Sequence, residues 1–290
     1  MCGIVAAAAQ REVSGILLEG LRRLEYRGYD SAGMALIDAG QALQLHKHAG
    51  KVKNLEDANA RHPILGQRGV AHTRWATHGE PTSANAHPHL SGERVALVHN
   101  GIIENHATLR NALKAEGVVF QSETDTEVIV HLIHSSLAQG ETLFDAVRLT
   151  VAKLEGAYAI AVVDTSHDDE VVVAREGSPL VLGIGIGEMF AGSDTLALRQ
   201  VTDTFVYLED GDLAILSAGG YQIFDKTGDS LERAETRLRD TDNQADRGEF
   251  EHYMLKEIYE QPDRLRDTLT FEALDDGLFG EAAAAIFDHV

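Results

Sequence analysis

The stretch Cys2-Gly3-Ile4-Val5-Ala6-Ala7-Ala8-Ala9 follows Met1 and contains the only cysteine among the 290 residues of the chain. From Ile4 to Ala9 the side chains are apolar and mostly small, which indicates a buried strand. The segment that follows has apolar residues at helical spacing: Val13, Ile16, Leu17, Leu21 and Leu24. We therefore expect a buried strand followed directly by an amphipathic helix.

Helical and strand-like patterns are mixed up to about residue 155, and strand-like patterns dominate from 157 to 224. The alternation is too irregular for parallel βαβ units, so it favours an α+β fold with stacked sheets. Within the mixed part, Val118–Phe120 indicates a short strand. Ser122–Asp125 can cap a helix over Glu127–Leu137, because side-chain oxygens accept hydrogen bonds from free N–H groups of the first turn.

The composition changes after residue 225. Residues 226–249 are polar with little apolar periodicity, which predicts a linker. Helical patterning returns over Phe250–Leu269, so we expect residues 250–290 to be the truncated start of a second domain. Residues 2–225 then form the first domain.

The charge balance excludes some classes of function. The chain has 25 basic and 46 acidic residues, a net charge of −21, which argues against binding to nucleic acid or to an anionic membrane surface. A single cysteine excludes an intrachain disulfide and a cysteine-cluster metal site. No apolar run of membrane-spanning length and no basic N-terminal region are present, so we expect a cytoplasmic protein.

The position of Cys2 suggests a nucleophile. Methionine aminopeptidases remove Met1 when the next side chain is small, which would leave Cys2 with a free α-amine. The pKa of an α-amine is roughly 7.7–8.0, so the amine could act as the general base for the thiol of the same residue. The alternative from position alone is that Cys2 is a small buried hydrophobic residue.

Five motifs follow one another in a fixed order: Cys2–Val5, Leu24–Gly33, His72–Gly79, Val98–Gly101 and Ser122–Glu127. Together they resemble the N-terminal-nucleophile, or class II, glutamine amidotransferases. The resemblance covers residues 2 to about 225 and resumes at His252–Pro262. The version of the second motif, Glu25-Tyr-Arg-Gly-Tyr-Asp-Ser-Ala-Gly33, is similar to that of members that pass ammonia to fructose 6-phosphate.

The resemblance implies a four-layer α/β/β/α sandwich of the N-terminal-nucleophile hydrolase type. It implies a catalytic group in which Cys2 attacks the glutamine side-chain amide, Asn100 and Gly101 form the oxyanion hole and Arg27 lies beside the nucleophile. It also implies a set of residues around the substrate: Arg74 on the α-carboxylate, Asp125 on the α-ammonium, and Trp75, Thr77, His78 and Gly101 lining the pocket.

Taken without the resemblance, several of these residues have simpler interpretations. Asn100-Gly101 is also typical of a turn, and Asp125 could cap the following helix. Trp75 could be a core aromatic residue, and Arg27 could belong to a turn or an ion pair.

A group of histidines suggests a metal-dependent amidohydrolase as an alternative: His72, His78, His87, His89, His99 and His106. No His-Glu-x-x-His pattern supports it, and we expect neither a metal nor another cofactor. One residue departs from the family pattern, because Ala6 stands where the family has glycine. A backbone conformation with positive φ at that position would be disfavoured.

The expected reaction is hydrolysis of glutamine to glutamate and ammonia through a Cys2 thioester. Ammonia would convert fructose 6-phosphate to glucosamine 6-phosphate only through the second half of a longer enzyme, in which the resemblance also implies a homodimer. Two alternatives stay open within this family. One is a domain that serves another ammonia acceptor, and the other is an inactive glutamine-binding domain that retains Met1.

Overall fold

The computed structural model describes residues 2–76, 79–166, 170–238, 250 and 253–270. It divides into two compact units, residues 1–239 and 240–290. The second unit contains helix α6 (Tyr253–Thr270). Among the helices of the described residues, none is both long and apolar enough to span a membrane.

The first unit contains two sheets in which all strand neighbours are antiparallel. Sheet A has the spatial order β15 (Glu235–Arg237), β11 (Thr204–Tyr207), β9 (Val181–Ile184), β10 (Glu188–Gly192), β1 (Gly3–Ala9), β4 (Arg68–Arg74), β2 (Ser31–Ile37) and β3 (Leu43–Ala49). Sheet B has the order β14 (Ser230–Leu231), β13 (Gly220–Phe224), β12 (Leu213–Ser217), β8 (Val171–Glu176), β7 (Gly156–Asp164), β6 (Val95–Ile103) and β5 (His89–Ser91).

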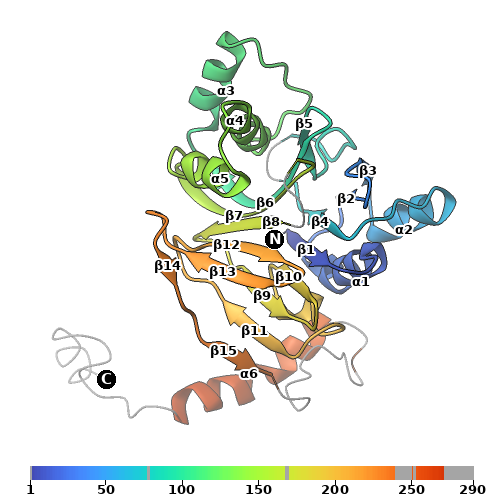
Figure 1. The fold of residues 1–290 in the computed structure, drawn as a ribbon. Coiled ribbons are helices and arrows are strands. Elements are labelled where there is room, and N and C mark those ends of the chain that lie inside the picture. The colour runs from blue at the N-terminus through green and yellow to red at the C-terminus, as the bar shows by residue number, and fades with distance from the viewer. Residues whose placement is uncertain (1, 77–78, 167–169, 239–249, 251–252, 271–290) are drawn as a thin grey trace, which may run out of the picture. The chain divides into compact units, whose positions relative to one another are not determined.

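Helices cover the outer face of each sheet (Figure 1). The helices that pack on sheet A are α1 (Ser14–Leu24) and α2 (Val52–Arg61), with short 3-10 turns at Glu25–Arg27 and Thr195–Ala197. The helices that pack on sheet B are α3 (His106–Ala115), α4 (Glu127–Ala138) and α5 (Leu143–Val151). The result is an α/β/β/α sandwich, the four-layer arrangement that the family resemblance implies.

Strand β1 shows why the first residues decide this arrangement. Side chains alternate across a strand, so Ile4, Ala6 and Ala8 join the core between the sheets. Val5 and Ala7 point the other way, into the core beneath α1 and α2. Both faces of the central strand are therefore buried, which explains the continuous apolar run. Ala6 is fully buried in regular pairing with Val70 and Ala191, so alanine is compatible with the backbone there.

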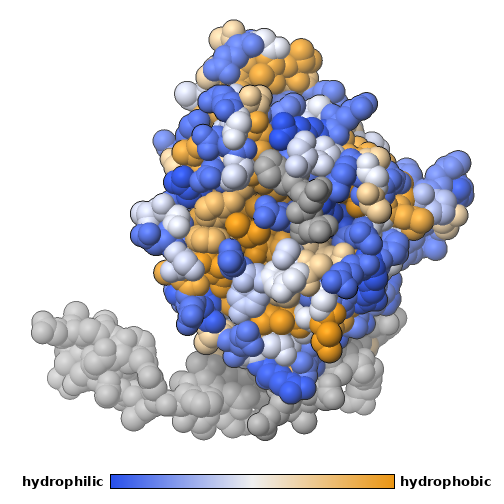
Figure 2. Space-filling view, in the orientation of Figure 1, coloured by the Kyte–Doolittle hydropathy of each residue, from blue (hydrophilic) through white to orange (hydrophobic). Residues whose placement is uncertain are grey.

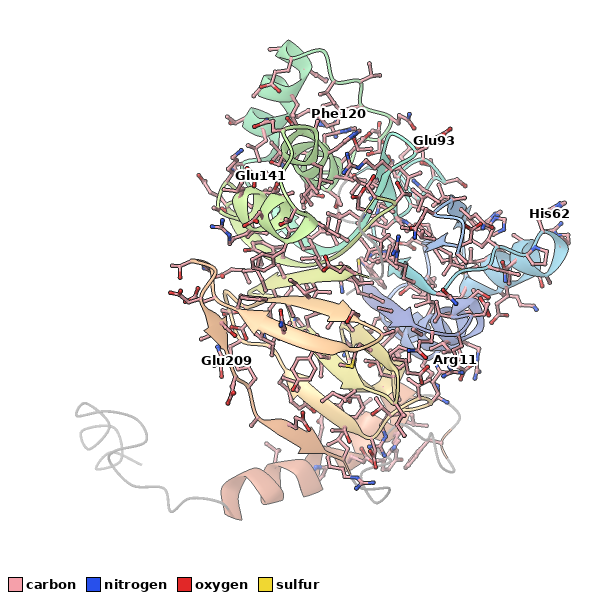
Figure 3. All side chains as sticks on the ribbon, in the orientation of Figure 1. Arg11, His62, Glu93, Phe120, Glu141 and Glu209 are labelled. Carbon is pink, nitrogen blue, oxygen red and sulfur yellow. The ribbon has the colours of Figure 1, made fainter. Side chains whose placement is uncertain are left out.

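Two expectations about local structure differ from the observed fold. Residues 118–120 form no strand; the segment lies between α3 and α4, and Figure 3 labels Phe120 there. The Phe120 ring packs against His131 at 5.0 Å and under the Arg110 guanidinium at 4.2 Å. Strands β14 and β15 fall inside the predicted linker, residues 226–249. Short strands at sheet edges need little apolar periodicity, so their polar sequence does not reveal them.

Candidate active site

The thiol of Cys2 lies at the beginning of β1, beside the end of β4. Pairing of Gly3 with Thr73 brings Cys2 next to Arg74 and Trp75. The backbone N–H of Trp75 donates to Cys2 Sγ at 3.2 Å. Burial raises the pKa of the Cys2 thiol, while the Trp75 N–H and the positive charge of Arg74 act in the opposite direction. The thiol therefore needs a base near neutral pH, and it already has a donor for its ionised form.

Asp30 holds the Trp75 backbone in this orientation, a role that the sequence did not reveal. Its backbone N–H donates to the Arg74 carbonyl at 3.0 Å, and its carboxylate accepts from the Ala76 N–H at 2.9 Å. These two bonds flank Trp75 and so fix the N–H that contacts Cys2 Sγ. Asp30 lies in the Arg27-Gly-Tyr-Asp30 stretch that carries the resemblance, and that was the available signal.

Asn100 and Gly101 lie in β6, opposite Ala159 and Tyr158 of β7. The interpretation of this dipeptide as a turn is therefore wrong. Gly101 has φ +136°, and a Cβ atom there would lie 2.0 Å from the Ala157 carbonyl oxygen. Only glycine tolerates both the positive φ and the close carbonyl oxygen. The positive φ distorts the strand at the point where it reaches Cys2.

Replacement of Gly101 with alanine is expected to destabilise the fold by about 3 kcal/mol or more, because backbone strain and a steric clash add. Gly220→Ala is the matched control: Gly220 has φ +147° with no atom within 4 Å of the added Cβ. The control should cost only the backbone strain, about 1–3 kcal/mol. Thermal unfolding of both variants separates the backbone strain from the steric clash. Equal losses of stability in the two variants would contradict a contribution from the clash.

Cys2, the predicted nucleophile, and the predicted oxyanion hole share one cavity of about 440 Å³. It is lined by Cys2, Arg27, Trp75, Asn100, Gly101, Ile102, Glu104, Ala157, Ser178 and Pro179. Figure 2 shows apolar side chains near the middle of the visible face, beside the N-terminus marked in Figure 1. Ala157 lies in β7, and Ser178 and Pro179 lie between β8 and β9. They had no sequence signal, because only the tertiary structure brings them to the cavity.

Arg27 lines this cavity and also forms an ion pair with Asp194. Its Nε donates to the Tyr26 hydroxyl at 3.1 Å. Trp75 is 47% exposed and meets the Tyr29 ring edge-on at 6.1 Å. The alternative of a core tryptophan is therefore wrong. The alternative that Arg27 forms an ion pair is correct, and this pair lies at the cavity that contains Cys2.

Arg74 and Asp125 are each 4% exposed. The Arg74 guanidinium donates to the Glu80 carbonyl at 3.2 Å, and Asp125 Oδ2 accepts from the Ile103 N–H at 2.8 Å. Burial lowers the pKa of Arg74, and the negative charges of Cys2 and Asp125 oppose that shift. Arg74 thus lies close enough to interact electrostatically with both Asp125 and Cys2. Thr77 and His78 lie outside the described residues.

Asp125 does not cap α4. The cap position is Thr126, without a side-chain cap bond. Instead the carboxylate of Glu127 accepts from the N–H groups of Gln121 and Ser122, both at 2.7 Å. The expected helix is present, but Asp125 is left to hold β6 at Ile103, directly beyond the predicted oxyanion hole.

Four of the clustered histidines, His72, His87, His89 and His99, are buried, and the His87 ring contacts those of His72 and His89. His106 instead contacts the Ile103 carbonyl at 2.8 Å. Within the described part of the chain, no group of three or more His, Cys, Asp or Glu side chains has a geometry that could hold a metal ion. The buried rings form hydrogen bonds with the protein, so nothing in their arrangement favours the metal-dependent alternative.

Comparison with known proteins indicates a glutamine amidotransferase domain, as the motifs do. A family model described as a glutamine amidotransferase domain matches residues 72–200. Over its full length the chain is 52% identical to "Glutamine--fructose-6-phosphate aminotransferase [isomerizing]" of Pseudomonas putida, and it covers 48% of that protein. It is 54% identical over 93% of its length to the protein of the same name from Salmonella typhi, of which it covers 44%. The chain thus spans about half the length of the curated relatives that it matches.

Among solved structures, glutamine phosphoribosylpyrophosphate (PRPP) amidotransferase from B. subtilis, complexed with ADP and GMP, is similar with a TM-score of 0.68 and 28% identity. The match covers 78% of this chain and 49% of that one. Sequence and structural similarity therefore point to one family, on which the order of motifs and the sandwich fold agree. The chain contains a glutamine amidotransferase domain, and it is homologous to about half the length of proteins named glutamine–fructose-6-phosphate aminotransferase.

Proposed function

We propose that the domain hydrolyses glutamine to glutamate and ammonia, with Cys2 as the nucleophile. The observation that supports this most directly is that Cys2, Asn100 and Gly101 line one cavity, with the Trp75 N–H 3.2 Å from the sulfur. A nucleophile beside donors for a developing oxyanion is the arrangement that acyl transfer requires.

The reaction begins when the α-amine of a mature Cys2 takes the thiol proton while Sγ bonds to the side-chain carbonyl carbon of glutamine. The carbonyl oxygen becomes an oxyanion, which accepts hydrogen bonds from the Asn100 amide and the Gly101 N–H. The tetrahedral intermediate collapses, the C–N bond breaks, and the nitrogen leaves as ammonia with the proton held by the amine. Water, deprotonated by the same amine, then hydrolyses the γ-glutamyl thioester and regenerates the thiol.

Arg74 is proposed to bind the α-carboxylate of glutamine, and Asp125 its α-ammonium. Arg74→Lys is expected to raise KM roughly 10- to 100-fold and to change kcat less, because an ammonium cannot reproduce the planar two-donor contact. Arg22→Lys, at an exposed α1 pair with Glu19, is the matched control. Steady-state kinetics test both variants, and an unchanged KM in Arg74→Lys would exclude this role.

Removal of Met1 is the experiment that tests the proposal as a whole. We expect intact mass measurement to show chains that begin at Cys2, and glutaminase activity to increase in proportion to their fraction. Activity should rise with pH near the α-amine pKa of roughly 7.7–8.0, because only the neutral amine accepts a proton. Full activity in chains that retain Met1 would contradict the α-amine as base. Chains without Met1 that bind glutamine but never hydrolyse it would instead be a binding domain.

We propose that residues 250–290 correspond to the start of the sugar-phosphate isomerase half of the longer relatives, after a linker. In such an enzyme the ammonia would be transferred to fructose 6-phosphate. The 290 residues alone should release glutamate and ammonia in equal amounts without forming glucosamine 6-phosphate. Formation of that product by these residues would contradict the proposal that aminosugar synthesis requires the other half of the longer enzyme. The cytoplasmic location and the homodimer stay predictions.

A further inference from the structure

His72 is a buried residue of β4 that touches the proposed oxyanion hole from the opposite sheet. It is 0% exposed, and it points into the space between the sheets beside Ile4, its partner across the β1–β4 pair. Its Nε2 lies 3.0 Å from the backbone oxygen of His99 and 2.9 Å from Asn100 Oδ1. No step of the proposed reaction uses this histidine.

Two backbone carbonyls determine where the protons lie in this contact. The His99 carbonyl can only accept a hydrogen bond, so Nε2 of His72 must carry a proton. The Asn100 atom facing that N–H must then be the acceptor, Oδ1. On its other side, the Asn100 amide nitrogen lies 3.1 Å from the Cys2 carbonyl, which also can only accept. Both ends of the network therefore require the same orientation of the Asn100 amide.

The surroundings of His72 keep its ring neutral and in place. Burial lowers the pKa of His72 to about 3, so the ring is uncharged near neutral pH. The His87 ring stacks on it with centroids 4.2 Å apart and planes at 19°. His87 Nδ1 also accepts the His99 N–H at 3.2 Å. Two neutral rings thus hold both backbone polar groups of the residue that precedes Asn100.

We infer that His72 is a positioning residue for the oxyanion hole: its Nε2–H, donated to Asn100 Oδ1, keeps the amide nitrogen of Asn100 turned toward Cys2. This inference rests on the proposed function. A reversed amide would present an oxygen lone pair where the negative charge develops, so the donor would become a source of repulsion. The orientation would be fixed before substrate binds.

Two substitutions separate the hydrogen bond from the packing of the ring. His72→Phe keeps an aromatic ring for stacking on His87 but has no donor. His72→Gln loses the ring but can place an amide N–H near the position of Nε2. We expect His72→Phe to lower kcat roughly 10- to 100-fold with little change in KM, and His72→Gln to stay within a few-fold of the unmodified protein. The opposite ranking would show that ring packing is what matters and would overturn the inference.

Inhibition by glutamate γ-semialdehyde gives a readout that a purely structural role would not move. The Cys2 sulfur adds to the aldehyde carbon, the carbonyl π bond opens, and the thiol proton ends on the oxygen, which occupies the oxyanion hole. Glutamate binds without that step. The preference for the aldehyde over glutamate should fall in His72→Phe and be restored in His72→Gln. An unchanged preference in His72→Phe would count against the inference.

The tautomer of His72 can be measured independently of activity and of any variant's folding. A ¹⁵N spectrum of the unmodified protein should show His72 protonated at Nε2 and unprotonated at Nδ1 at neutral pH. A proton on Nδ1 would overturn the inference even in an inactive protein. Absence of glutamine hydrolysis by processed, unmodified protein would instead refute the proposed function. Normal hydrolysis together with a fully active His72→Phe would refute this inference alone.

Discussion

Replacement of Cys2 with alanine is expected to lower glutamine hydrolysis by roughly 10⁴- to 10⁶-fold. The thiol would form the only covalent bond between protein and substrate, so its loss removes the reaction path rather than weakening one contact. The half-buried thiol already receives the Trp75 N–H at 3.2 Å, and alanine has no atom that can attack in its place. The measurement is the initial rate of glutamate and ammonia release.

The controls for this variant address binding and processing. Alanine and serine at position 2 are both small enough for Met1 removal, so Cys2→Ser tests whether a weaker nucleophile in the same place retains any activity. Glutamine should still bind to Cys2→Ala in calorimetry, because Arg74 and Asp125 are unchanged. Undiminished hydrolysis by Cys2→Ala would exclude the thiol as nucleophile. If a chelator then abolished that activity, the metal-dependent alternative would be favoured.

Replacement of Asn100 with aspartate is expected to lower kcat roughly 10³-fold, with KM within a few-fold of its original value. The change is nearly isosteric, but it exchanges a donor for an oxygen and adds a negative charge beside the oxyanion. The Asn100 amide also donates to the Cys2 carbonyl at 3.1 Å, so the variant places two oxygens against each other. Pre-steady-state formation of the thioester is the step that should slow.

Asn54→Asp is the matched control for this substitution. Asn54 lies on α2, and its amide donates to a backbone carbonyl, that of Ala49, at 2.9 Å. The same chemical change, with loss of the same type of hydrogen bond, occurs there outside the cavity. We expect kcat to be unchanged in the control. Equal losses in the two variants would indicate destabilisation rather than a role at the oxyanion, and thermal unfolding would verify it.

The most accurate expectations concerned elements whose structure follows from the pattern of their own residues. The helix over Ser14–Leu24 follows from apolar spacing, and the buried β1 follows from an uninterrupted run of small apolar residues. The strand expected at Val118–Phe120 fails because a short apolar run is equally suited to cover a helix, as Phe120 does beside α4. The edge strands β14 and β15 were missed because they are two and three residues long and mostly polar, too short for a pattern to show. Strand β15 also depends on pairing with the distant β11.

The resemblance to a family, the order of the motifs and the residues proposed for the chemistry could all be predicted from the sequence, because they depend on which side chains are present. What each of these residues contacts depends on how the chain folds. Gly101 lies within a strand, and Asp125 holds the backbone at Ile103 instead of capping a helix. The orientation of the Asn100 amide depends on His72, which reaches it from the other sheet. Such contacts join residues far apart in the chain, so no local pattern records them.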